Sequence, residues 1–282
     1  MKQKPITRFF LYVAAILVAV FMLAPFLWMV LASFHTQADL LSMPLHWLPK
    51  PFFPDRYVML FTDQSNPQAV LFRAALLNSF IIASCVVIVS MIVGIFGAYA
   101  FARMRFGGRR GILMTFLFTY MLPQIALIVP LYLILSNLGM LDTRTGLIIV
   151  DCSLVVPFVL WILSNYFLTI PLELEESAWI DGASRVSALF RIVLPSAGPG
   201  IFAAAMFAFL LAWDEFMYGL LFTSTGASKT IPVAISEFSA QHATDFGLVS
   251  AGGVLAALPP VILAIIFQRY VVSGLVSGAV KT

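Results

Sequence analysis

The chain has 282 residues, 61% of them hydrophobic and only 10% charged, with a formal net charge of +3. Soluble proteins average about 45–50% apolar and about 25% charged residues, so a water-soluble monomer is excluded. The two cysteines, Cys85 and Cys152, both lie in apolar runs, which excludes a disulfide framework and a Cys-rich metal site. The small, scattered positive charge does not indicate nucleic-acid binding.

Six apolar stretches are long enough to cross a bilayer as helices, since about 20 mostly apolar residues cover about 30 Å of hydrocarbon. Runs such as Cys85–Ile92 are continuously apolar, whereas strands of a membrane barrel alternate apolar and polar residues. The sequence therefore predicts an all-α membrane protein with six transmembrane helices, forming one domain over residues 1–282. The first helix is too long for a signal-peptide core and is expected to be retained. The expected spans are residues 9–33, 76–102, 112–136, 146–168, 199–222 and 247–270.

Lys and Arg predict the orientation, because they collect in the loops of the cytoplasmic side. They are more numerous on the side of the amino terminus, at Lys2, Lys4, Arg8, Arg103, Arg105, Arg109, Arg110, Arg185, Arg191, Arg269 and Lys281. The opposite loops hold fewer, at Lys50, Arg56, Arg73, Arg144 and Lys229. Both termini are therefore expected in the cytoplasm.

The largest loop on the outer side covers residues 34–73 and is rich in proline and aromatic residues. A loop of this length is either ordered against the protein's own helices or is a docking surface for a partner, and both readings stay open. The histidines, His35, His46 and His242, all fall in outer loops, where a solvated histidine is expected rather than a metal ligand.

The cytoplasmic loop 169–195 is long enough to have its own structure. Pro171 suits a first helical position, and Glu173, Glu175 and Glu176 favour the positive end of a helix dipole. Gly182 suits the left-handed end of that helix, and Ser184 can cap a second helix that stops at Pro195. This helix–turn–helix is expected to expose an apolar surface, made by Leu172, Trp179, Ile180, Val186, Leu189 and Phe190.

The segment Glu176-Ser177-Ala178-Trp179-Ile180-Asp181-Gly182-Ala183, followed by Ile192-Val193-Leu194-Pro195, resembles the E-A-A-x-x-D-G-A…I-x-L-P signature of ABC importer permeases. Ser177 departs from the usual alanine by one small residue for another. The chain is also similar to the carbohydrate branch of that family at residues 76–79, 212–216 and 274–281. The resemblance covers essentially the whole chain.

The resemblance implies the type I ABC importer permease fold in a bacterial plasma (inner) membrane. Residues 172–181 would form the coupling helix, which docks on an ATP-binding subunit, with Glu175 and Glu176 facing basic residues of that partner. The implied partners are a second permease in a heterodimer, two ATP-binding subunits and an extracytoplasmic solute-binding protein. The residues expected to couple are Leu172, Glu175, Glu176, Ser177, Ala178, Trp179, Asp181, Gly182, Ala183, Leu194 and Pro195.

The chain itself is expected to hold no cofactor and to catalyse no reaction. It contains no G-x-x-x-x-G-K-[ST] motif, so ATP and Mg would be bound by the partner subunit. It also contains neither H-E-x-x-H nor G-x-S-x-G. The resemblance further implies that the tail 273–282 contacts the ATP-binding subunits. The outer loop 223–246 is a candidate contact for the binding protein.

Polar residues inside the spans are candidates for a substrate path, because an intramembrane carboxylate costs about 2.5–3.5 kcal/mol on insertion scales. Carboxylates, carboxamides and aromatic faces are the groups that bind a polyhydroxylated ligand. Pro123 and Pro130 are expected to loosen the third span around Gln124. Ordinary helix packing is the alternative for each residue. The candidates are Asn78, Tyr120, Gln124, Asp151, Trp213, Asp214, Glu215 and Tyr218.

Other functions remain to be weighed against the importer. A secondary transporter usually has inverted halves and mid-depth coupling carboxylates, neither of which is visible in the sequence. A polytopic scaffold or enzyme subunit would not need the cytoplasmic motif. A homodimeric amino-acid or metal permease would share that motif but not the patterns at residues 212–216 and in the tail. The cargo stays open among monosaccharides, disaccharides, glycerol phosphate and modified sugars.

Overall fold

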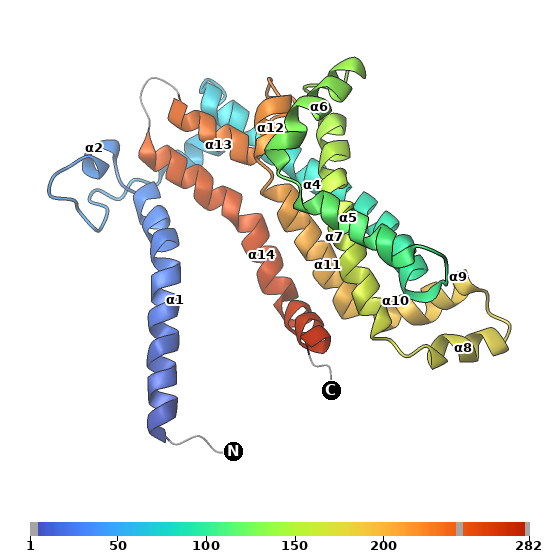
Figure 1. The fold of residues 1–282 in the computed structure, drawn as a ribbon. Coiled ribbons are helices and arrows are strands. Elements are labelled where there is room, and N and C mark those ends of the chain that lie inside the picture. Colours follow the sequence, from blue (N-terminus) through green and yellow to red (C-terminus); the bar gives the residue numbers. More distant parts are fainter. Residues whose placement is uncertain (1–4, 241–244, 280–282) are drawn as a thin grey trace. The chain divides into compact units, whose positions relative to one another are not determined.

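A computed structural model describes the backbone of residues 5–240 and 245–279, and the side chains of residues 6–238 and 245–268 (Figure 1). Every regular element in these ranges is a helix, as the sequence predicts. Lys2, Lys4, His242 and Lys281 lie outside the described residues. The side chains of Arg269 and of the tail 273–282 also lie outside the described residues. The expected contacts of that tail therefore stay a prediction.

Four described helices are long and apolar enough to cross a membrane: α1 (Pro5–Ser33), α4 (Pro67–Arg103), α7 (Arg144–Leu168) and α14 (Phe246–Ala279). The number rises to six if each of two sharply bent helix pairs is one span, namely Arg109–Met121 with Gln124–Asn137 and Arg185–Ser196 with Gly198–Trp213. The other helices are α2 (Gln37–Leu40), α3 (Asp55–Thr62), α5 (Arg109–Met121), α6 (Gln124–Asn137), α8 (Glu173–Ile180), α9 (Arg185–Ala188), η1 (Leu189–Val193), α10 (Leu194–Ser196), α11 (Gly198–Trp213), α12 (Met217–Phe222) and α13 (Ile231–Ala240).

The expected third span is broken into α5 and α6, which meet at 95°. The break falls at Leu122, whose backbone is extended (φ −65°, ψ 137°), directly before Pro123. A proline disfavours the helical conformation of the residue before it, so the chain turns here. The structure therefore replaces one loosened helix by two separate helices.

The expected fifth span is also discontinuous. Helix α11 ends at Trp213, residues 214–216 are not helical, and α12 begins at Met217. The carboxylate of Glu215 accepts hydrogen bonds from the backbone N–H groups of Tyr218 and Gly219, at 2.8 and 2.9 Å. This is the bonding of a helix amino terminus, which explains why a new helix starts here.

The chain divides into two compact units, which are described separately: residues 1–73 with 234–257, and residues 74–233 with 258–282. In the second unit α7 packs against α5 and α11. Small residues allow close approach to α7, from α4 at Gly94 and from α11 at Gly200, as is typical in membranes. A Cβ added at Gly94 would lie 2.6 Å from Cγ1 of Val159, and one added at Gly200 would overlap the ring of Tyr166.

In the first unit the loop 34–73 is ordered against its own surroundings. Phe34 stacks on Phe52 with ring centroids 4.6 Å apart. Arg56 is 4% exposed, forms an ion pair with Asp245 at 3.0 Å and donates to the backbone oxygen of Ser33. Part of this loop therefore packs on the protein's own elements. Met43, Trp47 and Leu48 are 97%, 72% and 63% exposed, so the alternative of a docking surface stays a prediction.

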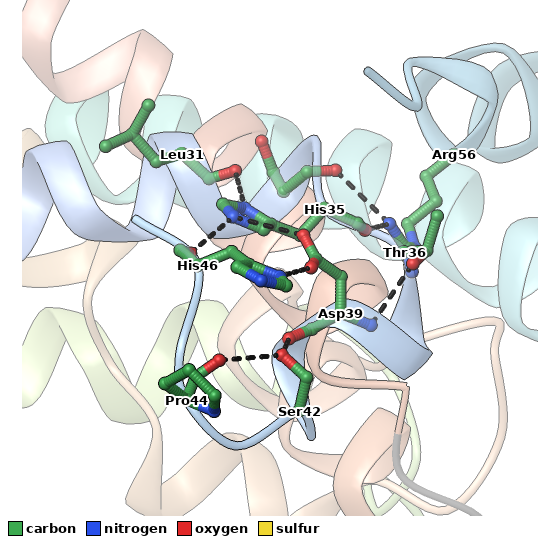
Figure 2. Close-up of polar contacts among 9 residues, drawn as sticks. Leu31, His35, Thr36, Asp39, Ser42, Pro44, His46 and Arg56 are labelled. Carbon is green, nitrogen blue, oxygen red and sulfur yellow. Dashed lines mark hydrogen bonds and ion pairs between the residues drawn. The ribbon is translucent and has the colours of Figure 1, made fainter. Parts of the chain in front are cut away.

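A buried polar cluster fixes the start of the same loop (Figure 2). The ring nitrogens of His35 lie 2.8 Å from the backbone oxygen of Leu31 and 3.0 Å from that of His46. The imidazole of His46 lies 2.6 Å from Asp39, whose carboxylate also lies 3.5 Å from His35. His35 is 0% exposed, so the expectation of a solvated histidine is wrong there. It holds for His46, whose side chain is 59% exposed.

Candidate functional site

The second unit contains a cavity of about 660 Å³ at the two helix breaks. One wall is formed where α5 gives way to α6, another where α11 gives way to α12, and α7 supplies the third. Discontinuous helices within a membrane are tolerated where they line a cavity or are buried in protein, which fits this position. The lining residues are Tyr120, Gln124, Asp151, Leu154, Val155, Phe158, Phe207, Leu210, Leu211, Asp214, Glu215, Phe216 and Met217.

The structure brings together Tyr120, Gln124, Asp151, Asp214 and Glu215 of the eight residues expected to line a substrate path. The remaining three lie outside the cavity. Trp213 and Tyr218 are 2% and 0% exposed and pack within the unit. The side-chain amide of Asn78 donates to the backbone oxygens of Gly226 and Lys229, and its oxygen accepts from Arg144. Its observed contacts are therefore with a loop.

The carboxylates of the cavity differ in their partners. Asp151 is 2% exposed, and its Oδ1 has no hydrogen-bond partner. Glu215 is 8% exposed, and both its oxygens accept backbone N–H groups of α12. Asp214 is exposed at the carboxyl end of α11. Of these three carboxylates, Asp151 thus has a buried acceptor atom that is left without a donor.

Aromatic rings form much of the remaining wall. Tyr120 stacks on Phe158 with centroids 5.6 Å apart, and Phe158 meets Phe207 edge to face at 6.2 Å. Phe158, Phe207 and Phe216 were not predicted to line the path, because a phenylalanine in a mostly apolar segment is typical of plain helix packing. Such rings offer flat faces to the C–H groups of a sugar, and the neighbouring carboxylates offer acceptors to its hydroxyls.

The loop 169–195 has the expected helix–turn–helix form, although its first helix begins at Glu173 and not at Pro171. Helix α8 covers Glu173–Ile180, and Gly182 follows in the left-handed conformation with φ +85°. The hydroxyl of Ser184 accepts from the N–H of Ser187 at 3.2 Å and so caps the second helix. That second helix continues past Pro195 to Ser196, one residue further than predicted, and then bends by 82° into α11.

Glu175 does not face outward as expected. It is 0% exposed, pairs with Arg103 of α4 at 2.5 Å, and accepts from the hydroxyl of Tyr99 at 2.8 Å. Arg103 also donates to the backbone oxygen of Ile170. The prediction that Glu175 meets a basic residue of a partner is therefore replaced by an internal anchor that joins α8 to α4.

The other side of the loop presents apolar groups to solvent. Ile180 is 86% exposed, Val186 60% and Phe190 51%, whereas Leu189 is buried, contrary to expectation. Trp179 is partly covered by the guanidinium of Arg185, which lies 5.1 Å from its ring. Glu176, Ser177, Asp181, Gly182 and Pro195 are exposed, Leu172 is 38% exposed, and Ala178, Ala183 and Leu194 are half-buried.

One residue that holds a loop in place, Asp142, was not predicted from the sequence. Asp142 precedes α7 in the left-handed conformation (φ 54°), and its carboxylate accepts from Ser224 N, Thr225 N and the hydroxyl of Ser228. Burial acts to raise the pKa of Asp142, but these hydrogen bonds outweigh it and hold the pKa well below its usual range. Asp142 thus fixes the loop that begins at Thr223. Aspartate is among the residues that tolerate φ > 0, but its partners more than 80 residues away are not visible in sequence.

The described residues contain no group of three or more His, Cys, Asp or Glu that could hold a metal ion. The cavity offers acceptors and rings, and the loop offers an anchored apolar surface.

Comparisons with known proteins agree with these features. The chain is 38% identical over 282 residues to the trehalose/maltose transport system permease protein MalG of Thermococcus litoralis, covering 100% of this chain and 99% of the relative. It is 35% identical to the sulfoquinovosyl glycerol transport system permease protein SmoH of Agrobacterium fabrum, over 96% of this chain and 93% of the relative. It is 31% identical to the diacetylchitobiose uptake system permease protein DasC of Streptomyces coelicolor, over 100% of both chains.

The fold is similar to that of a chain in a bacterial ABC transporter involved in the import of the acidic polysaccharide alginate. That similarity has a TM-score of 0.75 at 22% identity, over 96% of this chain and 99% of the other. A family model for binding-protein-dependent transport system inner membrane components matches residues 90–277, more than half of the chain. The protein is therefore a multi-pass membrane protein that belongs to the family of binding-protein-dependent transport system inner membrane components, the ABC importer permeases.

Proposed function

We propose that this chain is the transmembrane permease subunit of an ATP-driven, binding-protein-dependent importer for a sugar or sugar derivative. The loop 169–195 carries the proposal, because it presents exposed Ile180 and Val186 on a helix pair that Glu175 anchors to α4. An exposed apolar patch rimmed by charge is typical of an interaction site. The relatives named for trehalose, maltose and diacetylchitobiose support a sugar as cargo.

In this proposal six spans cross the membrane, with α5–α6 as the third span, α11–α12 as the fifth, and both termini in the cytoplasm. The chain pairs with a second permease, and two ATP-binding subunits supply ATP and Mg. An extracytoplasmic solute-binding protein delivers the cargo and contacts the loop 223–246, of which residues 241–244 lie outside the described ranges. The tail 273–282 contacts the ATP-binding subunits.

Movement is transmitted through α8. Closure of the ATP-binding subunits draws the coupling helices together, and the Glu175–Arg103 ion pair passes this displacement to α4. The second helix of the loop ends at Ser196, and α11 begins two residues later, at Gly198. A displacement of the loop is therefore passed directly to α11. Alternating access of the cavity is the expected result.

The test is purification of the chain from its native membranes in mild detergent, with identification of the proteins that accompany it. Ile180→Glu places a charge on a side chain that is 86% exposed, so the fold should persist while docking fails. Met43→Glu is the matched control, since Met43 is 97% exposed in the loop 34–73. We expect the wild type and Met43→Glu to retain an ATP-binding subunit and a second permease, and Ile180→Glu to lose the ATP-binding subunit.

Two outcomes would contradict the proposal. The first is purification of the wild-type chain without any partner, under conditions that preserve other membrane complexes. The coupling role of the loop would then be rejected, and a secondary transporter would become the favoured function. If Ile180→Glu and Met43→Glu retain the ATP-binding subunit equally, the contact lies elsewhere on the chain.

A further inference from the structure

The cavity of the second unit has a marked chemical asymmetry. Three carboxylates, of Asp151, Asp214 and Glu215, lie among its lining residues. The described lining residues include no Lys, Arg or His. An anion entering this cavity would therefore find no cation to pair with among these residues, and an unpaired charge buried away from water is costly.

The hydrogen-bonding groups of these carboxylates are biased in the same way, toward acceptors. Oδ1 of Asp151 is a buried acceptor without a donor, in a side chain that is 2% exposed. Both oxygens of Glu215 already accept N–H groups of α12, so Asp151 is the buried carboxylate left to accept from a ligand. Buried acceptors are normally satisfied, so Asp151 points to a ligand that brings a donor.

We infer that the cavity binds a hydroxyl-rich ligand without an acidic group, either uncharged or cationic, and excludes uronates, sulfonates and phosphates. Its hydroxyl or ammonium donors meet Asp151 and Asp214, while a C–H face lies on the rings of Tyr120 and Phe158. This deepens the proposed function and rests on it for the identity of the cargo as a sugar. The cargoes named for the proteins reported above differ in this respect. Two of these proteins are named for neutral sugars, one for a sulfonated sugar derivative, and one for import of the acidic polysaccharide alginate.

The charge selectivity can be measured without knowing the cargo. In the purified complex, Cys85 and Cys152 are replaced by serine and a single cysteine is placed in the cavity by Leu154→Cys. A cationic and an anionic methanethiosulfonate of similar size are compared for their rates of modification. Met43→Cys, in an exposed loop position, gives the reference ratio of the two reagents. We expect the cationic reagent to be favoured at Leu154→Cys by about tenfold more than at the reference.

The carboxylates responsible are identified by neutralisation. Asp151→Asn combined with Asp214→Asn should move the ratio toward the reference value, with Glu215 left in place because it caps α12. Asp55→Asn, which neutralises an exposed carboxylate outside the cavity, should leave it unchanged. Equal ratios at Leu154→Cys and Met43→Cys, or a ratio that survives the double substitution, would overturn the inference.

Ligand class is tested by protection of the same cysteine. Maltose and glucosamine should slow modification of Leu154→Cys, whereas glucuronate at the same concentration should not. In the Asp151→Asn, Asp214→Asn variant, glucuronate should protect more than it does in the unneutralised cavity. Protection of the unneutralised cavity by glucuronate overturns the exclusion of acids, and absence of protection by all three overturns the sugar site. Neither outcome bears on the importer itself, which is judged by recovery of the ATP-binding subunit.

Discussion

Glu175 of α8 and Arg103 at the end of α4 form a buried ion pair across 72 residues of sequence. Tyr99, one turn before Arg103, donates to the same carboxylate. The acidic residue therefore holds the predicted coupling helix on a long membrane helix. The neighbouring Glu176 is exposed and is free to meet a partner.

Glu175→Ala is expected to detach α8 from α4. Removing one member of a buried pair leaves the other charge uncompensated and costs about 3–5 kcal/mol. Hydrogen exchange of the α8 amides should accelerate, and ATPase activity should lose its stimulation by the binding protein. Tyr99→Phe removes one hydrogen bond to the carboxylate and should have a smaller effect, about 1–3 kcal/mol.

The double variant Arg103→Met, Glu175→Leu is the control. Replacement of a buried pair by apolar residues of similar size is often neutral or stabilising, so α8 should stay protected from exchange. If Glu175→Ala exchanges like the wild type, the ion pair does not hold the helix.

Asp142 makes a second prediction, on the dependence of loop order on pH. Its pKa is lower in the folded chain than in the unfolded chain, so its contribution to stability is complete above the unfolded value, about 4. That contribution is lost as pH falls toward the folded pKa. Exchange of the Ser224 and Thr225 amides, corrected for the intrinsic rate at each pH, should therefore be slow at pH 7 and should rise as the medium is acidified below about pH 4.

Substitutions at this position separate charge from backbone strain. Asn tolerates the left-handed conformation that Asp142 adopts, so Asp142→Asn should remove the pH dependence while keeping the turn. Asp142→Ala should loosen the loop further, because alanine is strained at φ 54°. Equal pH profiles for the wild type and Asp142→Asn would show that another group controls the loop.

The parts of the fold that sequence predicted depend on local signals. Gly182 and Ser184 act within three residues of their own positions, and both the left-handed turn and the cap are confirmed. Pro123 acts on the residue before it, and the helix does break there, although into two separate helices. Apolar runs likewise predicted where the long helices lie, because helix formation in lipid depends on composition over about 20 residues.

The parts that sequence missed depend on partners far along the chain. The break at residues 214–216 was hidden, because adjacent Asp214 and Glu215 look like two charges on one helix. Only the structure shows that Glu215 caps α12. The burial of Glu175 and His35 was missed for the same reason, since their partners could not be paired from one sequence. Five of eight expected path residues do meet at one cavity, but their role in transport stays a prediction.

Close packing of α11 against α7 gives a third prediction. A Cβ at Gly200 would overlap the ring of Tyr166, whereas a Cβ at Gly198 would meet no atom within 4 Å. Gly200→Ala should therefore destabilise the protein by about 1–3 kcal/mol through overpacking. Gly198→Ala, in the same helical turn, is the matched control and should leave the thermal midpoint of the purified complex nearly unchanged. A loss of similar size in both variants would mean that helix entropy, and not the contact with Tyr166, decides the effect.

The polar cluster at the start of the loop 34–73 gives the last prediction (Figure 2). His35 is 0% exposed, and both its ring nitrogens are within hydrogen-bond distance of backbone oxygens, so His35→Ala removes at least one hydrogen bond and opens a cavity. A loss of about 2–4 kcal/mol in local stability is expected. His46→Ala should cost about 0–1 kcal/mol, because the side chain of His46 is 59% exposed. Hydrogen exchange at Leu40 and Leu41, whose amides bond within α2, measures both effects. Both variants lose an imidazole near Asp39, and equal exchange rates would show that the buried ring of His35 does not hold the loop.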